Sequence, residues 1–517
     1  MNRLQRALGH TTAYSATFAS LLALVACSSD GGEDVVPPFQ SSPVPGATTP
    51  IDPGNGAPVN MDGTTPVTPG NPSGDMSTDV PLAPGDQGDG QGDGNGQVPP
   101  GEEQPPPGEE QPPPGEEQPP PGEEQPPPGE EQPQPEPGTF VENSGVGCTV
   151  PQLPAANTLT AINGLPDPFT KLDGTRMTTR AEWRCRRAEI KELAEQYIYG
   201  DKPARPESVT GSVSGTNITV NVRNGNASTS FSARIQLPNG ASGPVPALFT
   251  VGGFSQSNVV QSEGVAIIDF QPFDVGDEGG SRANKQGAFY DIYGANSFTG
   301  LLAAWSWGVS RMIDVIEESG GNVIRADALA VAGCSRFGKG AFTIGAFDER
   351  IALTIPFESG SGGVPIWRGI PGEGAQSLQS AFGETYWLGD NFGSFINDGQ
   401  NNLPVDTHEI VAMVAPRGLL ILDNPFIANL GPRSAHVAAQ AGAQVFQALG
   451  AGANISYNSA VASGTHCSAR PEHVEPLRQA LRKFLLKTGN AAGSITTGGS
   501  AQGNLGQFVN YTVPTLN

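Results

Sequence analysis

The chain has 517 residues, a formal net charge of −24, 69 glycines and 49 prolines. So many glycines and prolines cannot all lie inside helices and strands, so we expect part of the chain to be non-globular. The charge is concentrated in residues 28–140, which contain 21 Asp and Glu residues and no Lys or Arg. The rest of the chain is nearly neutral, which argues against nucleic acid as a partner.

The first 27 residues have the pattern of a lipoprotein signal peptide. Two basic residues, Arg3 and Arg6, precede an apolar run that ends in Leu24-Val-Ala-Cys27. This pattern predicts lipidation of Cys27, and the alternative is an ordinary signal peptide with a chance cysteine. Because Ser28 rather than Asp follows Cys27, we expect a secreted lipoprotein at the outer membrane or cell surface, attached to the membrane by its lipid alone. No other apolar run has the roughly 20 residues that a spanning helix needs.

Residues 28–140 are predicted to form a disordered linker. They include five near-copies of a seven-residue Gly-Glu-Glu-Gln-Pro-Pro-Pro unit between Gly101 and Pro135, and hardly any aromatic residue. Such a segment cannot bury enough apolar surface to offset the entropy lost on ordering. We expect its proline-rich half to be extended and its glycine-rich half to be a looser coil.

Residues 141–490 are predicted to form the folded domain. Apolar runs alternate there with helix-like segments, a pattern typical of an α/β fold with a largely parallel sheet. The expected helix over 179–199 begins with a capping-box pattern, Thr179 followed by Glu182. The glycine-rich tail, residues 491–517, contains a strand-like stretch over 508–515. The expected strands are 209–223, 230–236, 247–252, 265–270, 329–332, 353–357, 419–422 and 455–459, and the other expected helices are 298–318, 434–449 and 471–487.

The stretch from Leu329 to Ala341 predicts a nucleophilic serine. It reads as a buried strand, a turn of small residues and the start of a helix, with Ser335 in a Gly-x-Ser-x-x-Gly pattern. A sharp turn of this kind exposes a hydroxyl above the carboxyl edge of a parallel sheet and aims a helix N-terminus at developing negative charge. The alternative is that Ser335 only caps a helix.

A serine nucleophile needs a histidine base and a carboxylate that orients it. His466 lies in a loop between the last expected strand and the last expected helix, where this fold places its base. His408, His436 and His473 have structural interpretations, because they lie beside an apolar segment or on expected helices.

Two carboxylates are candidates for the acid of the triad. Glu358 follows the expected strand 353–357, and Asp423 ends the expected strand 419–422, which is the commoner position for the acid in this fold. Four cysteines remain besides Cys27, and in an oxidising compartment they predict two disulfides with three possible pairings.

Five separated motifs follow one another along the chain: Leu165-Pro-Asp-Pro-Phe, Thr179-Arg-Ala-Glu-Trp-Arg-Cys-Arg-Arg-Ala-Glu-Ile, Gly333-Cys-Ser-Arg-Phe-Gly-Lys-Gly, Glu358-Ser-Gly-Ser-Gly-Gly and Thr465-His-Cys. Together they resemble the motifs of the glucuronoyl esterases, carbohydrate esterases with an α/β-hydrolase fold. The resemblance covers about residues 148–490. It implies a three-layer sandwich and a Ser335, His466 and Glu358 triad, with Arg336 helping to form the oxyanion hole. It therefore favours Glu358 over Asp423.

The same resemblance implies a substrate and the side chains that bind it. The substrate would be the ester between a (4-O-methyl-)glucuronic acid of glucuronoxylan and a lignin alcohol, bound by Lys339, Gln376 and Glu384. The family often has a tryptophan before Leu-Gly-Pro, where this chain has Asn429. This departure leaves the preference for a 4-O-methyl group open. Gln376 and Glu384 are eight residues apart, which would place them on one face of a helix.

The resemblance also implies the disulfides Cys148 with Cys185 and Cys334 with Cys467. It requires no metal or organic cofactor, and no His, Cys or Asp cluster in the sequence has metal-ligand spacing. No pattern specifies an oligomeric state, and a monomer is expected. The alternative functions are an acetylxylan or feruloyl esterase, or a catalytically inactive glycan-binding protein.

Overall fold

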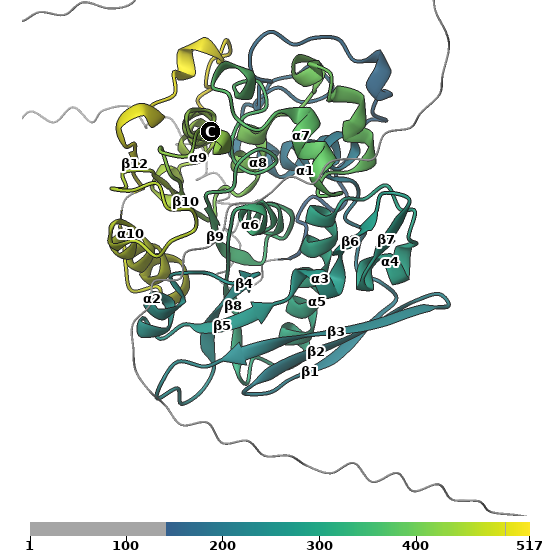
Figure 1. Ribbon diagram of the computed structural model, residues 1–517, viewed down its shortest axis with the longest axis vertical. Coiled ribbons are helices and arrows are strands. Elements are labelled where there is room, and N and C mark those ends of the chain that lie inside the picture. The colour runs from purple at the N-terminus through teal and green to yellow at the C-terminus, as the bar shows by residue number, and fades with distance from the viewer. Residues whose placement is uncertain (1–140, 492) are drawn as a thin grey trace, which may run out of the picture. The chain divides into compact units, whose positions relative to one another are not determined.

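The computed structural model describes residues 141–491 and 493–517 (Figure 1). The predicted signal peptide, the lipidation site Cys27 and the predicted linker lie outside these residues. No helix in the described ranges is both long and apolar enough to cross a membrane.

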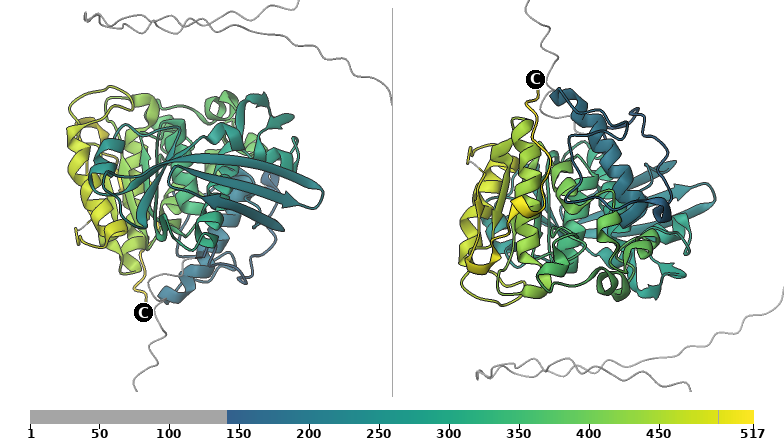
Figure 2. Two further views of the ribbon diagram at one scale, coloured as in Figure 1. Left: turned by 90° about the horizontal axis from the view of Figure 1, so that it is seen from below. Right: turned by 90° about the horizontal axis from the view of Figure 1, so that it is seen from above.

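A ten-stranded sheet forms the centre of the described domain. Its order is β1-β2-β3-β5-β4-β8-β9-β10-β11-β12; β1 to β3 are antiparallel, β3 pairs antiparallel with β5, and the strands from β5 to β12 are parallel. The antiparallel strands lie at one end of the sheet and project past the helices in both views of Figure 2. The strands are β1 (Ser208–Val213), β2 (Asn217–Asn224), β3 (Ala227–Gln236), β4 (Val245–Val251), β5 (Ala266–Phe270), β8 (Ile324–Cys334), β9 (Ile351–Phe357), β10 (Gly418–Leu422), β11 (Ile455–Asn458) and β12 (Ile495–Thr496).

Helices cover both faces of the sheet, as the prediction of a three-layer sandwich requires. Successive strand residues point to opposite faces, so that Phe249 and Val331 pack with α1, α5, α6, α8 and α9, whereas Leu248 and Ala330 pack with α2 and α10. The helices are α1 (Trp183–Ala194), α2 (Ser257–Ser262), α3 (Pro272–Val275), α4 (Ala288–Tyr293), α5 (Leu301–Glu318), α6 (Arg336–Phe347), α7 (Leu378–Glu384), α8 (Thr407–Met413), α9 (Pro432–Ala448) and α10 (Pro471–Leu481).

The predicted capping box is present, because the Thr179 side chain accepts from the Glu182 backbone and the Glu182 carboxylate accepts from the Thr179 N–H. The prediction of one continuous strand over 209–223 was wrong. The expected strand over 209–223 is a hairpin of β1 and β2, because Ser214 closes a turn with Asn217 through both its N–H and its hydroxyl. A short hairpin of β6 (Asp277–Ser281) and β7 (Asn284–Gln286) was missed, since its residues carry no apolar alternation.

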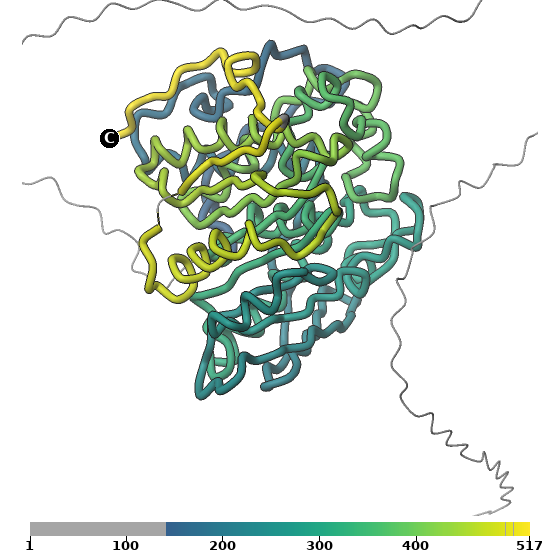
Figure 3. The backbone as a smooth tube through the Cα atoms, turned by 60° about the vertical axis from the view of Figure 1, so that its left-hand side comes forward, coloured from purple at the N-terminus to yellow at the C-terminus, as the bar shows by residue number. Residues whose placement is uncertain are grey.

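The C-terminal tail is part of the folded domain rather than a separate segment. The stretch over 508–515 was expected to be a strand and is irregular, because its backbone bonds to loops instead of to the sheet. Phe508 accepts a hydrogen bond from the Leu165 N–H at 2.7 Å, and the Asn517 N–H donates to Thr178 at 3.1 Å. Figure 3 shows this tail beside the first described residues, so the two ends of the domain stabilise each other.

Candidate active site

Ser335 occupies a sharp turn between β8 and α6. Its backbone has φ 60° and ψ −128°, which is unfavourable for a residue with a side chain. The turn is closed by a hydrogen bond from the Ser335 N–H to the Phe357 carbonyl at 3.0 Å. A side chain at Gly338 would come within 2.5 Å of that carbonyl, so the glycine allows the helix to start against β9. The sequence therefore places the Ser335 hydroxyl at the carboxyl edge of the parallel strands.

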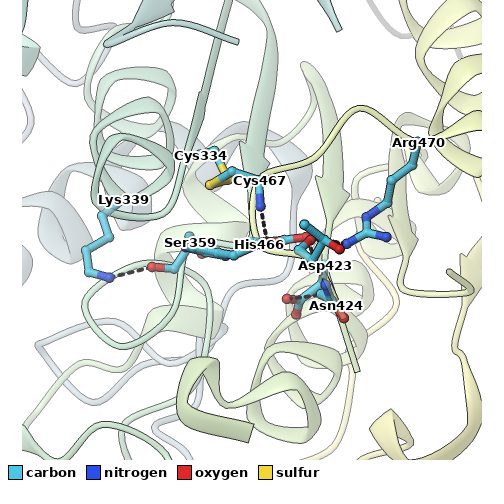
Figure 4. The surroundings of a disulfide bond; sticks show 10 residues. Cys334, Lys339, Ser359, Asp423, Asn424, His466, Cys467 and Arg470 are labelled. Atoms are coloured by element: carbon cyan, nitrogen blue, oxygen red, sulfur yellow. Dashed lines mark hydrogen bonds and ion pairs between the residues drawn. A yellow bond between two sulfur atoms is a disulfide. The ribbon is translucent and has the colours of Figure 1, made fainter. Parts of the chain in front are cut away.

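His466 meets Glu358 at the same edge of the sheet. The imidazole Nδ1 lies 2.5 Å from Glu358 Oε2. Glu358 directly follows β9 and is fully buried, whereas the His466 side chain is 41% exposed on the loop between β11 and α10. Figure 4 shows the imidazole between the disulfide and the residues that follow β10. The buried carboxylate can therefore orient an imidazole that remains accessible to a ligand.

Glu358 is held by several donors at once. The Cys467 N–H donates to Oε2 at 2.7 Å, and the Asn424 amide donates to Oε1 at 3.2 Å. The Arg470 guanidinium lies 3.5 Å from Oε1. Burial alone would raise the pKa of Glu358, but the hydrogen bonds from His466, Cys467 and Asn424 lower it below its ordinary value. Glu358 is thus ionised near neutral pH and can only accept hydrogen bonds.

Asp423 does not contact His466. Its carboxylate accepts hydrogen bonds from the Asn424 N–H at 2.9 Å and from the Tyr457 hydroxyl at 3.1 Å. Burial raises the pKa of Asp423 to about 7. Of the two carboxylates that the sequence left as candidates, Glu358 is the one whose geometry suits the orientation of the imidazole.

The other three histidines of the described residues have structural contacts. His408 is fully buried and bonds through Nε2 to the Pro166 carbonyl at 2.9 Å, and His436 Nδ1 accepts from the Gly503 N–H. The buried His473 ring packs edge-on against Phe357. These contacts agree with the structural interpretations drawn from the sequence.

A disulfide joins the residue before Ser335 to the residue after His466. Cys334 and Cys467 are bonded, with 5.7 Å between their Cα atoms, and the second disulfide joins Cys148 to Cys185. Both pairings match those that the family resemblance implied. No hydrogen bond joins the Ser335 hydroxyl to His466 in the described part of the chain, although the disulfide keeps their loops adjacent. Cys334, Cys467, Glu358 and His466 also cluster as metal ligands would, but the sulfurs are oxidised in the disulfide and cannot bind as thiolates.

Arg336 starts helix α6 directly after the nucleophile turn. Its guanidinium lies over the Phe337 ring, and its Nε is 3.2 Å from Oε1 of Glu278. The side chain is 44% exposed, so its remaining N–H groups can reach a ligand. The indole of Trp387 donates to the same Glu278 oxygen at 2.7 Å.

Lys339 lies one helical turn after Ser335. Its ammonium donates to the Ser359 carbonyl at 2.5 Å and lies 5.1 Å from the centre of the Trp387 ring. Burial lowers its pKa to about 8. Gln376 and Glu384 are hydrogen-bonded to each other, but Gln376 precedes α7, so the expectation that one helix carries both was wrong. Ser377 is the N-cap of α7, because its side chain accepts a hydrogen bond from the Ser380 N–H, so the helix begins two residues after Gln376.

Sequence reasoning missed four residues that shape this edge. Asn424 and Arg470 contact Glu358, and Glu278 and Trp387 link Arg336 to Lys339. Asn424 had a detectable signal, because it follows Asp423 at the end of an expected strand. The other three lie on loops or on the missed hairpin, where local pattern carries no information about long-range contacts.

Named 4-O-methyl-glucuronoyl methylesterases resemble this chain over about two thirds of its length. The 4-O-methyl-glucuronoyl methylesterase of Neurospora crassa is 37% identical over 362 residues, which cover 69% of this chain and 90% of the relative. The chain belongs to the glucuronoyl esterase family. The family's sequence model, described as "Glucuronyl esterase, fungi", matches residues 220–450. Membership makes this glucuronoyl esterase a carboxylic ester hydrolase.

Solved structures of the family share its fold. The glucuronoyl esterase catalytic domain of Hypocrea jecorina has a TM-score of 0.65 and 35% identity, and the match covers 71% of this chain and all of that one. A serine-to-alanine variant of the Sporotrichum thermophile enzyme, in complex with methyl 4-O-methyl-β-D-glucopyranuronate, matches with a TM-score of 0.64 and 36% identity over 71% of this chain and all of that one. The α/β-hydrolase fold expected from the sequence is confirmed.

Proposed function

We propose that this glucuronoyl esterase hydrolyses the ester between a (4-O-methyl-)glucuronic acid of glucuronoxylan and a lignin alcohol. In this proposal Ser335 is the nucleophile, His466 the base and Glu358 the acid that orients it. The observation that carries the assignment is the 2.5 Å contact from His466 to the buried Glu358, on loops that a disulfide ties to Ser335.

The reaction proceeds by two acyl transfers. Because the ionised Glu358 accepts a hydrogen bond from Nδ1, that nitrogen carries the proton and Nε2 is free to act as a base. Nε2 takes the Ser335 proton as the hydroxyl attacks the uronate carbonyl, and then returns it to the departing alcohol. Water, activated in the same way, releases the uronic acid from Ser335.

The oxyanion forms next to the N-terminus of α6. Backbone N–H groups at this helix start and the guanidinium of Arg336 are donors for the developing charge, and loss of one such donor typically costs about 3–4 kcal/mol. Lys339, Gln376 and Glu384 bind hydroxyls of the uronate ring. Before substrate arrives, Lys339 is already held by its hydrogen bond to the Ser359 carbonyl, and Gln376 and Glu384 are held by the hydrogen bond between them.

The test compares ester classes on the purified enzyme. Methyl and benzyl esters of glucuronic acid should be hydrolysed efficiently, and acetylated xylan and feruloylated arabinose should not. Ser335→Ala should abolish turnover while the enzyme still binds the glucuronate ester. A parent enzyme that prefers acetylated xylan would contradict the proposed substrate, and an active Ser335→Ala variant would contradict the proposed nucleophile.

We propose further that the enzyme acts outside the cytoplasm, held at the cell surface by a lipid on Cys27. Two disulfides in the domain suit an oxidising compartment. Cys27→Ser should move the enzyme from the membrane fraction to the culture medium and prevent incorporation of labelled palmitate. If the parent enzyme incorporated no labelled palmitate, the proposed anchor would be contradicted and the esterase assignment would stand.

A further inference from the structure

Glu278 connects the two sides of the active site through one carboxylate oxygen. Its Oε1 lies 3.2 Å from the Nε of Arg336 and accepts a hydrogen bond from the indole N–H of Trp387 at 2.7 Å. The ring of Trp387 lies 5.1 Å from the ammonium of Lys339. A residue outside the main sheet therefore contacts the arginine beside the nucleophile and, through an indole, the lysine one helical turn further on.

The hairpin that carries Glu278 is itself held firmly. Glu278 lies on β6, and the neighbouring Asp277 carbonyl accepts a hydrogen bond from the Tyr386 hydroxyl. Arg282, in the turn of the same hairpin, donates to the Leu388 carbonyl and to Asp390, both at 2.9 Å. The hairpin and the segment around Trp387 thus fix each other, and the Glu278 carboxylate, only 19% exposed, is presented in one place.

The ion pair uses only one edge of the guanidinium. Nε of Arg336 faces Glu278, and none of the four N–H groups on its Nη atoms donates a hydrogen bond within the described ranges. An unrestrained arginine at a half-exposed position would sample many rotamers, and the conformational entropy lost on fixing it would add to the activation free energy of each turnover. An ion pair with a half-exposed partner such as Arg336 contributes little to stability, so we assign this pair a role in orienting the arginine.

We propose that Glu278 is a positioning residue for ester hydrolysis: it holds Arg336 toward the oxyanion and holds Trp387 against Lys339. The inference rests on the proposed function, in which Arg336 stabilises the transition state and Lys339 binds the uronate. Glu278 does not touch the substrate. It acts on kcat through the arginine and on KM through the indole and the lysine.

Two substitutions separate these effects. In Glu278→Gln the amide oxygen can still accept from Trp387, but the charge that pairs with Arg336 is lost. We expect kcat for benzyl glucuronate to fall about threefold to tenfold, with KM and melting temperature unchanged. In Glu278→Ala both contacts are lost, and KM should rise as well. Glu207→Gln is the matched control, because Glu207 forms an exposed ion pair with Arg223 on the β1–β2 hairpin.

A double-mutant cycle with Arg336→Ala provides the decisive measurement. If Glu278 acts through Arg336, Glu278→Gln should lower kcat in the parent and have no further effect in the Arg336→Ala background. An unchanged kcat in Glu278→Gln, or an equal fall in both backgrounds, would overturn the proposal. A lower melting temperature with normal kcat would also overturn it, because a purely structural role predicts that result. Failure of the proposed function itself would appear separately, as a fully active Ser335→Ala enzyme.

Discussion

Replacing Glu358 by glutamine should show whether this carboxylate is the acid of the triad. Its Oε2 accepts hydrogen bonds from Nδ1 of His466 and from the Cys467 N–H, and its Oε1 accepts one from the Asn424 amide. A glutamine has one oxygen for these two positions. Whichever way its amide is turned, an N–H group faces another donor, and the negative charge that stabilises the protonated imidazole is gone.

The magnitude follows from these contacts. A hydrogen bond to a charged group contributes about 1.5–3 kcal/mol, so the loss of charge opposite His466 alone should lower kcat about 10-fold to 150-fold. Misorientation of the imidazole adds to this, and removing the charge of the acid in a Ser-His-Asp triad lowers kcat about 10,000-fold. We therefore expect kcat of Glu358→Gln to fall by a factor between about 100 and 10,000, with KM nearly unchanged.

The assay is steady-state hydrolysis of benzyl glucuronate, with Asp423→Asn as the matched control. Asp423 is equally buried and follows the neighbouring strand, but it bonds to Tyr457 rather than to His466. The kcat of Asp423→Asn should stay within about threefold of the parent, because a hydrogen bond that involves no residue of the triad affects stability more than turnover. The reasoning would be refuted if Asp423→Asn lost more activity than Glu358→Gln, or if Glu358→Gln kept more than a tenth of the parent kcat.

Three further predictions concern stability and pH. Burial raises the pKa of Asp423 from 3.8 to about 7, so between these two pKa values the native state keeps a proton that the unfolded chain has lost, and stability should fall as pH rises from about 4 to about 7. Asp423→Asn should therefore gain melting temperature relative to the parent between about pH 4 and about pH 7, and a constant difference over this range would contradict the reasoning. Replacing both Cys334 and Cys467 by alanine should lower the free energy of unfolding by about 5 kcal/mol for a separation of 133 residues, and loss of the other disulfide, of separation 37, by about 4 kcal/mol; only the first pair should also lower kcat when measured well below the melting temperature. Because burial lowers the pKa of Lys339 to about 8, KM for glucuronate esters should rise from pH 7.5 to pH 9 as the ammonium is lost, and Lys339→Met should have a high KM that no longer changes over this range.

The parallel part of the sheet and the nucleophile turn could be predicted from the sequence for one physical reason. Strands buried on both faces must be continuously apolar, and a sharp turn against a neighbouring strand must use small residues. Both signals are local. The β1–β2 hairpin was read as one strand because its turn contains no Asn-Gly or Asp-Gly pair. The tail over 508–515 was read as a strand because of its apolar residues, but its backbone bonds to loops rather than to the sheet.

The choice between Glu358 and Asp423 could not be made from local pattern. Both follow buried parallel strands, and β9 and β10 are neighbours in the sheet. The difference lies in the partners that the fold supplies: Glu358 faces the loop of His466, and Asp423 faces Tyr457 on β11. The role proposed for Glu278 was likewise inaccessible, because its partners lie 58 and 109 residues away along the chain.

Backbone strain marks the same site independently of any side-chain chemistry. Five residues other than glycine have positive φ in the described ranges, and three of them are Ser335, Glu358 and Cys467. Such conformations cost about 1–3 kcal/mol each and persist only where the surroundings fix them. Here the fixing contacts form a closed ring: the Ser335 N–H bonds to the residue before Glu358, the Glu358 carboxylate accepts from the Cys467 N–H, and Cys467 is bonded to the residue before Ser335. Each strained residue is therefore held by the other two, so a change at any one of them should displace the nucleophile, the base and the acid together.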